Sequence, residues 1–380
     1  MEIKIIPVKS KSDLRKFIHL PAEIHKDHTN WVPPIYMDEW TFFNPKKNEA
    51  FSHADTILLL AEKNGQLVGR IMGIINHLYN DTHQSKEGRF CFLETYDDFE
   101  VANALVTAIK DWVKTLGMSS IVGPLGFSDK DPQGFLIEGY DQPVVIATNC
   151  NFPYMVDFMD KMGFIKKIDL VVYKVNIPNP LPEIYGKISE RILRNNPEIK
   201  VVSFTSRRKI IPYIKPILNL VNETFKDIYG FSPLSDKEIK EFAGRYLPIL
   251  DPRFVKVVVN GKNEVIAFFI TMPDISEGIR KCKGYVLPFG IFHIFREQKK
   301  TKQLDMLLGA VREDYRDIGL NALMGFHMLG EALKRGMEFM DSHLEMETNL
   351  KMRAENERLG GVVYKRFRVF EKDLSELQEL

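Results

Sequence analysis

The chain repeats itself at a spacing of about 200 residues, and this repeat restricts its possible folds more than any other feature. In the first matching pair of segments several positions are identical, among them Asp27 and Asp227. Three pairs match in the same order and at nearly the same offset: 19–35 with 219–235, 59–76 with 257–274, and 158–175 with 356–373. A chance origin would not keep both order and offset, so we infer a tandem duplication.

Each copy shows the same succession of patterns: helix, hairpin, strand, helix, strand, helix, strand. This mixture of hairpins and strand–helix–strand units predicts an α/β protein with a mixed sheet in each copy. Three prolines in residues 178–187 mark the boundary between the copies. We therefore expect a first unit over residues 1–180, a linker helix within 181–200 and a second unit over 201–380.

Composition excludes several classes of protein. A net charge of +1 and the lack of a long basic run argue against a nucleic-acid partner. The three cysteines lie far apart, so we expect neither a disulfide framework nor a metal site. The N-terminal residues lack the apolar core of a signal peptide, and the longest apolar stretch, 284–295, is too short to span a bilayer. We expect a cytoplasmic protein without a transmembrane segment, and the sequence leaves its oligomeric state open.

The turn between the predicted strand 304–311 and the helix that follows contains Arg316 and Gly319. A helix N-terminus offers unpaired N–H groups and a partial positive charge, both of which suit a phosphate. Glycine allows close approach of the ligand, and arginine adds charge-assisted contacts. The corresponding turn of the first copy has Asp97 and Asp98, which would repel a phosphate. We expect an anion site at the second turn alone; otherwise Arg316 is a solvated surface residue and Gly319 a loop glycine.

The stretch DYRDIGLNALM, with a strand before it, resembles the acyl-CoA motif of the Gcn5-related N-acetyltransferases (GNAT), [QR]-x-x-G-x-[GA]. Asn321 stands where the family prefers a small residue. Residues 149–175 and 348–370 resemble the family's ending from an asparagine to a glycine–phenylalanine pair, so the chain looks like a bacterial double-GNAT protein. The resemblance implies acetyl-CoA or another acyl-CoA as co-substrate, held only by the second unit, while the first is a degenerate copy. The residues it assigns to the cofactor are Val311, Arg316, Asp317, Ile318, Gly319, Leu320, Asn321 and Asn349; an ordinary helix N-cap is the alternative for Asn349.

In a GNAT-like reaction an amine attacks the acyl thioester directly, which requires a group to take the amine proton. Residues 340–349 read as one strand, in which His343, Glu345 and Glu347 share a face by the two-residue period. Glu345 or Glu347 is the expected base, directly or through water. The alternative is that both are solvated or paired with a nearby cation such as Arg353.

The reaction also requires a proton donor for the leaving thiolate. The family's usual donor is a tyrosine on the helix after the asparagine, where this chain has Met352 and Arg353. Tyr364, early in the last strand, is the expected substitute, although a half-buried strand tyrosine is more often structural. Tyr154 of the first copy would serve only if the first unit faced the cleft of the second.

The sequence leaves the acceptor and two other functions open. The resemblance implies the amine of a small molecule or peptide as acceptor. An insertion in the second copy, residues 275–303, contains the apolar stretch and reads as a packed helix or turn, or else as an apolar lid. The lid favours an aminoacyl or long-chain acyl transferase of the paired-GNAT type. Asn321 and the missing helix tyrosine favour a non-catalytic acyl-CoA-binding protein.

Overall fold

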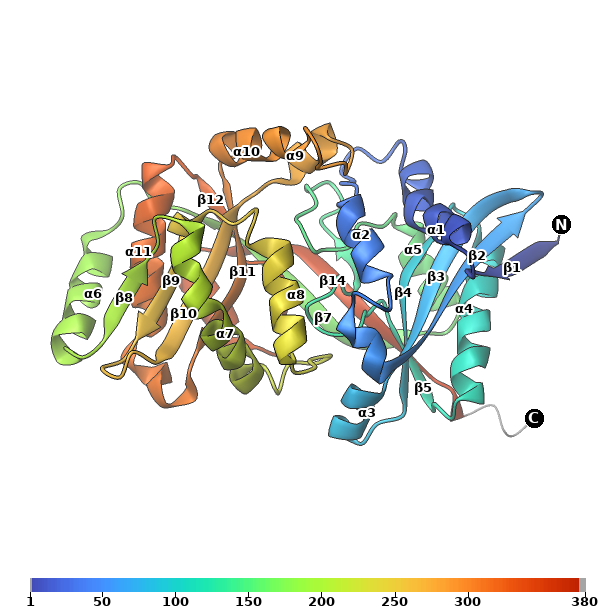
Figure 1. Cartoon of the computed structure of the whole chain (residues 1–380), viewed down its shortest axis with the longest axis horizontal. Coiled ribbons are helices and arrows are strands. Elements are labelled where there is room, and N and C mark those ends of the chain that lie inside the picture. The colour runs from blue at the N-terminus through green and yellow to red at the C-terminus, as the bar shows by residue number, and fades with distance from the viewer. Residues whose placement is uncertain (1, 376–380) are drawn as a thin grey trace.

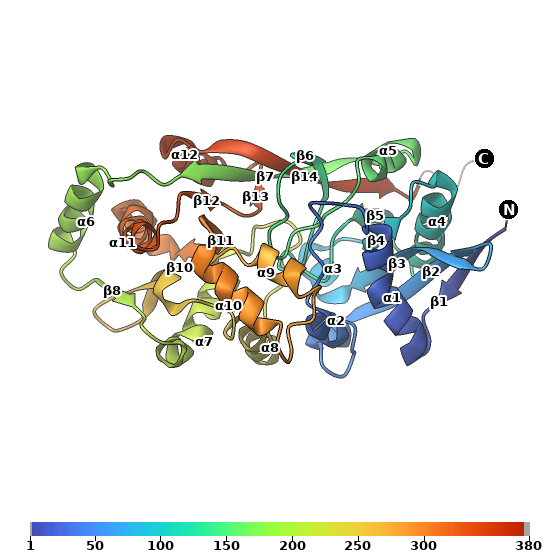
Figure 2. The ribbon, with the colours of Figure 1, turned by 90° about the horizontal axis from the view of Figure 1, so that it is seen from above.

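The computed structural model describes residues 2–375. In this part of the chain 14 strands form one mixed sheet that crosses the whole molecule (Figures 1 and 2). The order of the strands along the main path is β1-β2-β3-β4-β5-β14-β7-β12-β11-β10-β9-β8. No helix among residues 2–375 is long and apolar enough to cross a membrane. The predicted α/β class with a mixed sheet is confirmed.

Both copies contain the predicted succession of elements. The first copy forms β1 (Ile3–Pro7), α1 (Lys11–Ile24), α2 (Tyr36–Phe42), β2 (Ala54–Lys63), β3 (Gln66–Asn76), α3 (His77–His83), β4 (Glu87–Thr95), α4 (Phe99–Thr115), β5 (Ser120–Gly123), β6 (Phe135–Glu138), α5 (Tyr154–Lys161) and β7 (Ile165–Asn176). The second copy forms β8 (Lys200–Ser203), α7 (Arg207–Thr224), α8 (Asp236–Tyr246), β9 (Val255–Val259), β10 (Val265–Pro273), α9 (Ser276–Lys281), α10 (Ile291–Lys300), β11 (Gln303–Val311), α11 (Leu320–Lys334), β12 (Phe339–Asp341), β13 (Glu345–Met346), α12 (Leu350–Arg358) and β14 (Val362–Asp373). Helix α6 (Glu183–Asn195) lies within the range expected for the linker, and short 3₁₀ helices cover Glu49–His53, Pro252–Phe254 and Glu313–Ile318. The insertion at 275–303 is therefore helical, and its possible role as a lid stays a prediction.

Local sequence accounts for several of the helix ends. Ser10 before α1 and Ser235 before α8 each form a capping box with an acidic residue three positions later. After α4 and α11 the chain turns at Gly117 and Gly336, both with positive φ, which glycine adopts without steric cost. These signals set where the helices begin and end, and the sheet then determines how they pack.

The central strand of each copy carries the same irregularity. In the first copy the pairing of β3 with β4 shifts register beside Phe92, which has a φ of 52°. In the second copy the pairing of β10 with β11 shifts in the same way and leaves Leu307 without a partner in the register. A β-bulge of this kind bends the strand. Repetition of the bulge in both copies supports the duplication.

Beyond the bulge a notch opens between two parallel strands. Strand β11 pairs with β12 through three residues only, Gln303–Asp305 with Phe339–Asp341. Residues 306–311 of β11 continue without a partner on that side. The corresponding strands of the first copy, β4 and β5, likewise pair through three residues. In the second copy this notch leaves backbone groups of the central strand without a strand partner, whereas in the first copy the Phe90 carbonyl oxygen accepts a hydrogen bond from the Leu125 N–H.

The two copies exchange their last strands. Strand β14 lies between β5 and β7, and its Phe370, together with Leu374 just after the strand, packs in the core of the first half. Strand β7 pairs with β12, and its Val171 and Val175 pack in the core of the second half. Figure 2 shows β7 reaching toward α6 while β14 runs back toward α5. Division of the chain at 181–200 stays a prediction, but neither half of the sheet is complete without a strand from the other copy.

The exchange predicts that a mutation near the C-terminus destabilises the N-terminal half. Phe370 is 1% exposed in the first core, so Phe370→Ala should cost about 3–5 kcal/mol of unfolding free energy. All three tryptophans, Trp31, Trp40 and Trp112, belong to the first copy. Urea unfolding followed by tryptophan fluorescence therefore reports on that half.

The matched control is Val362→Ala on the same strand, where the side chain is 62% exposed. Its unfolding free energy should change by less than about 0.5 kcal/mol. An unchanged fluorescence transition for Phe370→Ala would show that the strand exchange does not hold the first half together.

Candidate active site

The notch beside β11 has two different faces. Leu304 and Met340 point to the face covered by α11 and α6. Leu308 and Ala310 point to the opposite face, which is covered by α7 and α8. The bulged Leu307 packs against the inner side of the insertion, α9 and α10. We call the face covered by α11 and α6 the helix face. We call the opposite face, on which the insertion also packs, the insertion face.

The turn before α11 leaves the helix N-terminus uncapped. Gly319 has a φ of 89°, which favours glycine, and no side chain of the described residues caps α11. In the first copy the Asp98 side chain accepts a hydrogen bond from the Val101 N–H and pairs with Lys63. A carboxylate thus occupies the first turn, while the N–H groups of the second remain available to an anion. This contrast agrees with the expectation from sequence, and anion binding itself stays a prediction.

The other cofactor residues predicted at this turn differ in what they can contribute. Arg316 is exposed and lies 3.9 Å from Glu313, a weak ion pair that leaves its guanidinium free to move. Asp317 is exposed, and Leu320 is fully buried. Val311 and Ile318 pack at the margin of the second core. Only Arg316 therefore offers an anion a side chain, and the others would contribute backbone groups.

Asn321 and Asn349 both have partners within the protein. The Asn321 amide donates to both carboxylate oxygens of Glu355, at 3.0 and 2.9 Å, and so connects α11 to α12. This contact gives Asn321 a structural reason to stand where GNAT proteins prefer a small residue. Asn349 caps α12 by accepting a hydrogen bond from the Met352 N–H. The geometry of Asn349 is thus that of the N-cap named as its alternative.

Glu345 lies on the helix face with a perturbed pKa. Its Oε1 accepts a hydrogen bond of 2.7 Å from the Asn356 amide, and its Oε2 is buried without a partner among residues 2–375. Burial raises the pKa of Glu345 to about 7, the hydrogen bonds with Asn356 and Ser342 oppose this, and the nearby charge of Glu355 adds to it. A carboxyl with this pKa exchanges a proton readily near neutral pH.

Glu347 is engaged in an ion pair. The Lys166 ammonium lies 2.6 Å from its Oε1, and the Asp169 N–H donates to the same oxygen at 3.2 Å. Pairing with a cation was the alternative to a role as base, with a lysine here in place of an arginine. Its catalytic role stays a prediction that the geometry does not favour.

One expectation about this strand was wrong. Residues 340–349 do not form one strand, because β12 ends at Asp341 and β13 begins at Glu345. His343 between them has a φ of 59°, so the two-residue alternation breaks there. Its imidazole therefore does not share the face of Glu345 and instead lies with Nε2 3.0 Å from the Ile146 carbonyl oxygen.

The insertion face holds a buried cluster of carboxyl groups that sequence reasoning missed. Asp305 and Asp341 are direct neighbours in the β11–β12 register and are 0% and 1% exposed. Asp274, at the end of β10, interacts electrostatically with both. The signal in the sequence was an aspartate within the apolar run LDMLL, which charged residues enter at a large cost unless they have a function or a partner.

Asp341 has several partners, whereas Asp305 has few. Asp341 accepts hydrogen bonds from the Tyr364 hydroxyl and the His343 N–H, and the Lys365 ammonium lies 3.3 Å away. Asp305 accepts one hydrogen bond of 2.7 Å, from the Gln303 amide. Its other oxygen, Oδ2, is buried without a partner among residues 2–375. A polar atom in this state is costly to bury, which marks it as a functional candidate.

The carboxyl cluster has a deficit of positive charge. Burial, together with repulsion from Asp274 and Asp341, raises the pKa of Asp305 well above its ordinary value. The ammonium of Lys365 offsets only part of the negative charge of the three carboxyls. Within residues 2–375 no group of His, Cys, Asp and Glu is arranged to hold a metal ion. The negative charge of the carboxyl groups and the unpartnered Oδ2 of Asp305 make the cluster suited to a cationic group such as an ammonium.

Tyr364 and His343 complete the cluster. Burial and the Asp341 charge raise the pKa of Tyr364 strongly, which keeps its hydroxyl protonated. Burial lowers the pKa of His343, so its imidazole is neutral. Because Nε2 faces a carbonyl oxygen, we assign the proton to Nε2, which leaves Nδ1 as an acceptor.

The first copy closes the insertion face of the second. The loop after β6 brings the Ile146 carbonyl to His343 and the Pro143 carbonyl to the Lys365 ammonium, at 3.1 Å. Tyr154 does not reach this site, because its hydroxyl donates to the Thr95 carbonyl oxygen in the first half. The contribution of the first copy is thus a loop rather than the tyrosine considered from sequence.

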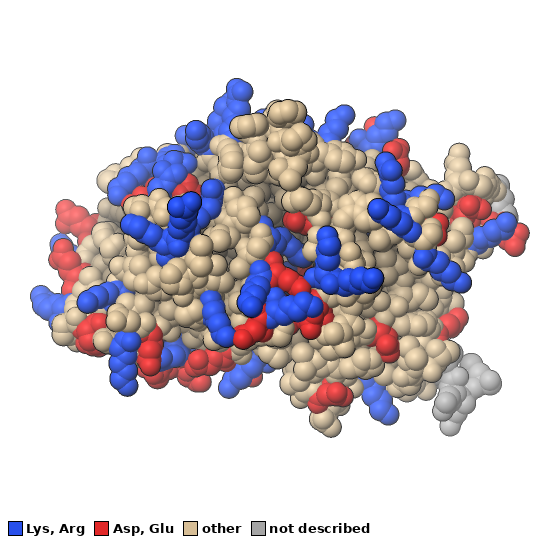
Figure 3. Space-filling model, viewed as in Figure 1, with Lys and Arg blue, Asp and Glu red and all other residues tan. Residues whose placement is uncertain are grey.

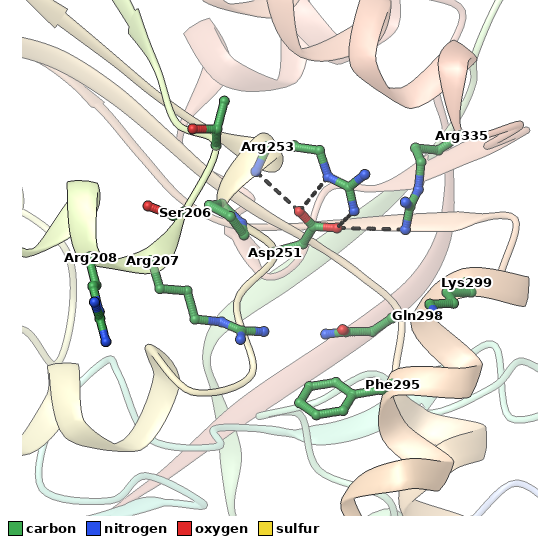
Figure 4. A pocket seen from close by; sticks show the side chains of 11 residues that line it. Ser206, Arg207, Arg208, Asp251, Arg253, Phe295, Gln298, Lys299 and Arg335 are labelled. Carbon is green, nitrogen blue, oxygen red and sulfur yellow. Dashed lines mark hydrogen bonds and ion pairs between the residues drawn. The ribbon is translucent and has the colours of Figure 1, made fainter.

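A separate basic pocket lies at the far end of β11, away from the notch (Figure 4). Its volume is about 880 Å³, and α7, α10 and the end of α11 line it. Asp251 is its one acidic lining residue and accepts contacts from Arg253 and Arg335. The five cations that line it are Arg207, Arg208, Arg253, Lys299 and Arg335.

No protein-family model matches the chain. Two curated proteins match almost all of it: "Bacterial ceramide synthase" of Caulobacter vibrioides (strain NA1000 / CB15N), 29% identical over 98% of each chain, and "Protein YghO" of Escherichia coli (strain K12), 25% identical over 96% of this chain and 94% of that protein. Two solved structures are similar over 98% of this chain. One is a tandem GNAT protein from the clavulanic acid biosynthesis pathway, with a TM-score of 0.55 and 12% identity over 99% of that protein. The other is a GCN5-related N-acetyltransferase from Sphaerobacter thermophilus, with a TM-score of 0.53 and 12% identity over 96% of that protein.

The raised pKa of Glu345 predicts a pH-dependent cost of folding. Its carboxyl ionises near pH 4.5 when unfolded but near 7 when folded, so wild-type stability should fall as pH rises from 4.5 to 7. Glu345→Gln removes this dependence. Relative to wild type, the variant should gain up to about 3 kcal/mol between pH 4.5 and 7.5 in urea unfolding experiments. A difference that stays constant with pH would contradict the raised pKa.

Proposed function

We propose that this protein, whose chain has the tandem GNAT fold, is an acyl-CoA-dependent N-acyltransferase with its active site at the notch of the second half. The observation that carries the proposal is that groups able to bind an anion or transfer a proton lie on both sides of one notch. An uncapped helix N-terminus and Glu345 lie on the helix face, and the buried, unpartnered Asp305 Oδ2 lies on the insertion face. The curated relative named as a ceramide synthase supports acyl transfer to nitrogen, because a ceramide is the amide of a long-chain amine.

We assign the acyl-CoA to the helix face. Its pyrophosphate would meet the N–H groups at the start of α11 and the Arg316 guanidinium. Its pantetheine arm would pair with the backbone of β11 beyond Asp305, where that strand has no partner on the notch side. The thioester would then lie at the apex of the notch, between Asp305 and Glu345.

We assign the acceptor amine to the insertion face. An amine arrives as an ammonium ion, which the carboxyl cluster attracts. Transfer of its proton to ionised Asp305 produces a neutral carboxyl and a neutral amine, the pair that a buried site favours. The amine nitrogen then attacks the thioester carbonyl, so that a C–N bond forms and the C–S bond breaks. The second proton that this nitrogen must lose passes to solvent water, and Asp305 releases its own proton to solvent before the next turnover. Tyr364 and Lys365 hold Asp341 in place beside Asp305.

Glu345 is suited to the leaving group. It lies on the helix face, where the CoA sulfur would be, and its pKa of about 7 lets it carry a proton at neutral pH. Protonated Glu345 would donate to the thiolate as the C–S bond breaks. This assigns Glu345 the part of acid and Asp305 that of base, whereas Glu345 or Glu347 was the base expected from sequence.

We further propose a lipid amine as the acceptor. The insertion places apolar side chains such as Val286 and Ile294 in one cluster with Leu307 of the notch. The relative named as a ceramide synthase also supports a long-chain substrate.

Cofactor binding should depend on the second turn and not on the first. Arg316→Glu replaces the one exposed cation predicted at the α11 turn by an anion and should weaken binding of CoA at least about tenfold. Asp97→Ala, at the turn of the first copy, is the matched control and should leave binding nearly unchanged. Isothermal titration calorimetry with CoA and acyl-CoA measures both, and equal effects of the two variants would remove the basis for this assignment.

Turnover should depend on Asp305 and Glu345 and not on Glu347. Asp305→Asn and Glu345→Gln should each lower kcat at least about 100-fold, because each removes a proton-transfer group. Release of free CoA thiol from long-chain acyl-CoA in the presence of a long-chain amine measures turnover, and calorimetry checks that acyl-CoA still binds. Glu347→Gln is the control and should keep activity within about threefold. Full activity of Asp305→Asn would overturn its role as base.

A further inference from the structure

The insertion, residues 275–303, carries an exposed apolar patch. Tyr285, Leu287, Phe289 and Phe292 are 57%, 62%, 74% and 66% exposed. They lie within eight residues of one another, in the loop between α9 and α10 and at the start of α10. Figure 3 shows the corresponding surface as an uncharged projection with Lys and Arg nearby on both sides. Side chains of this size that stand out together usually mark an interaction surface.

The same insertion concentrates positive charge. It contains seven Lys and Arg and two Glu, a net charge of +5, in a chain whose total is +1. Both glutamates are half-buried and paired, Glu277 with Arg280 and Lys281, and Glu297 with Lys281. Seven cations of the insertion are exposed: Arg280, Lys281, Lys283, Arg296, Lys299, Lys300 and Lys302. The Glu277 side chain is also 42% exposed, but it is paired with two of these cations.

Apolar and basic residues follow one another along the outer side of α10. Phe292 lies near its start, Arg296 one turn later, and Lys299 and Lys300 near its end. At that end the basic pocket begins, and Lys299 is part of its lining. Neither Lys299 nor Arg208 in the pocket pairs with a carboxylate of residues 2–375. The basic surface therefore extends beyond the insertion itself.

The inner side of the insertion packs on the notch. Val286 and Ile294 are buried in one cluster that includes Leu307 at the bulge of β11 and Ile146, whose carbonyl contacts His343. The insertion is therefore the single layer of chain that separates solvent from the insertion face of the candidate site. Whatever binds its outer side lies close to the acceptor side of the notch.

We propose that the insertion is a docking surface for an anionic lipid bilayer. Exposed aromatic and leucine side chains beside Lys and Arg are what interfacial binding requires, since the rings enter the headgroup region and the cations attract anionic lipids. Charge argues against a second copy of the chain as the occupant, because two insertions of net charge +5 would repel each other. The basic pocket at the end of α10 would take lipid phosphate groups. Docking deepens the proposed function by giving a lipid amine a route to the notch, but it does not require that the enzyme be active.

Binding to vesicles tests the proposal without any substrate. The full chain is mixed with vesicles of phosphatidylcholine alone or with 30% phosphatidylglycerol and then floated on a density gradient. We expect binding to the anionic vesicles, at least about tenfold weaker binding to the neutral ones, and loss of binding at high salt. Failure to bind anionic vesicles, or equal binding to both kinds, would overturn the proposal.

Two variants separate the apolar and basic contributions, and a third is the control. Phe289→Ser/Phe292→Ser and Lys299→Glu/Lys300→Glu should each lower binding to anionic vesicles at least about tenfold. Ile165→Ser/Ile184→Ser removes two other exposed apolar side chains, 64% and 55% exposed, and should not change it. Equal thermal stability of all variants shows that they fold. If Phe289→Ser/Phe292→Ser instead abolishes a dimer seen without vesicles and leaves vesicle binding intact, the patch is a protein interface and the proposal fails.

Discussion

Antiparallel pairing of β7 with β14 holds the structure together, because it joins the last strands of the two copies at the centre of the sheet. Each of these strands also contributes side chains to the core of the other copy, as Phe370 does in the first half and Val175 in the second. The halves are therefore connected through one continuous sheet as well as through residues 181–200. Their relative position is fixed by backbone hydrogen bonds, and this allows a loop of the first copy to hold His343 and Lys365 of the second.

Sequence reasoning found what depends on local periodicity. The duplication, the order of the elements and the turn before α11 all followed from patterns shorter than about 20 residues. The strand exchange did not, because β7 and β14 have the same pattern whichever half of the sheet they join. The kink at His343 was missed because a non-glycine residue with positive φ leaves no mark in an alternating pattern.

The residues of the candidate site were predicted only in part, because sequence patterns reveal local contacts and not contacts between distant segments. Glu345 was identified from its position, and the raised pKa that makes it useful arises from burial by α12, a contact over a short sequence distance. Asp305 was overlooked because its environment depends on Asp274, which follows β10, and on Asp341 of β12. A buried charge cluster built from three separate segments leaves only a weak sign in the sequence, here the single aspartate within the apolar run LDMLL. The notch places these two groups on opposite faces, so that in the proposed reaction proton uptake by Asp305 and proton delivery by Glu345 would occur on opposite sides of the sheet.

The strand exchange also sets the order in which the protein can be completed during synthesis. Strand β14 is the last strand to leave the ribosome, nearly 200 residues after β7. At 5–20 residues per second, β5 and β7 wait on the order of 10–40 s for the strand that belongs between them. During that time the first half exposes two strand edges and the part of its core that Phe370 will cover. Until β14 emerges, the first half is therefore an open sheet that can pair with other chains.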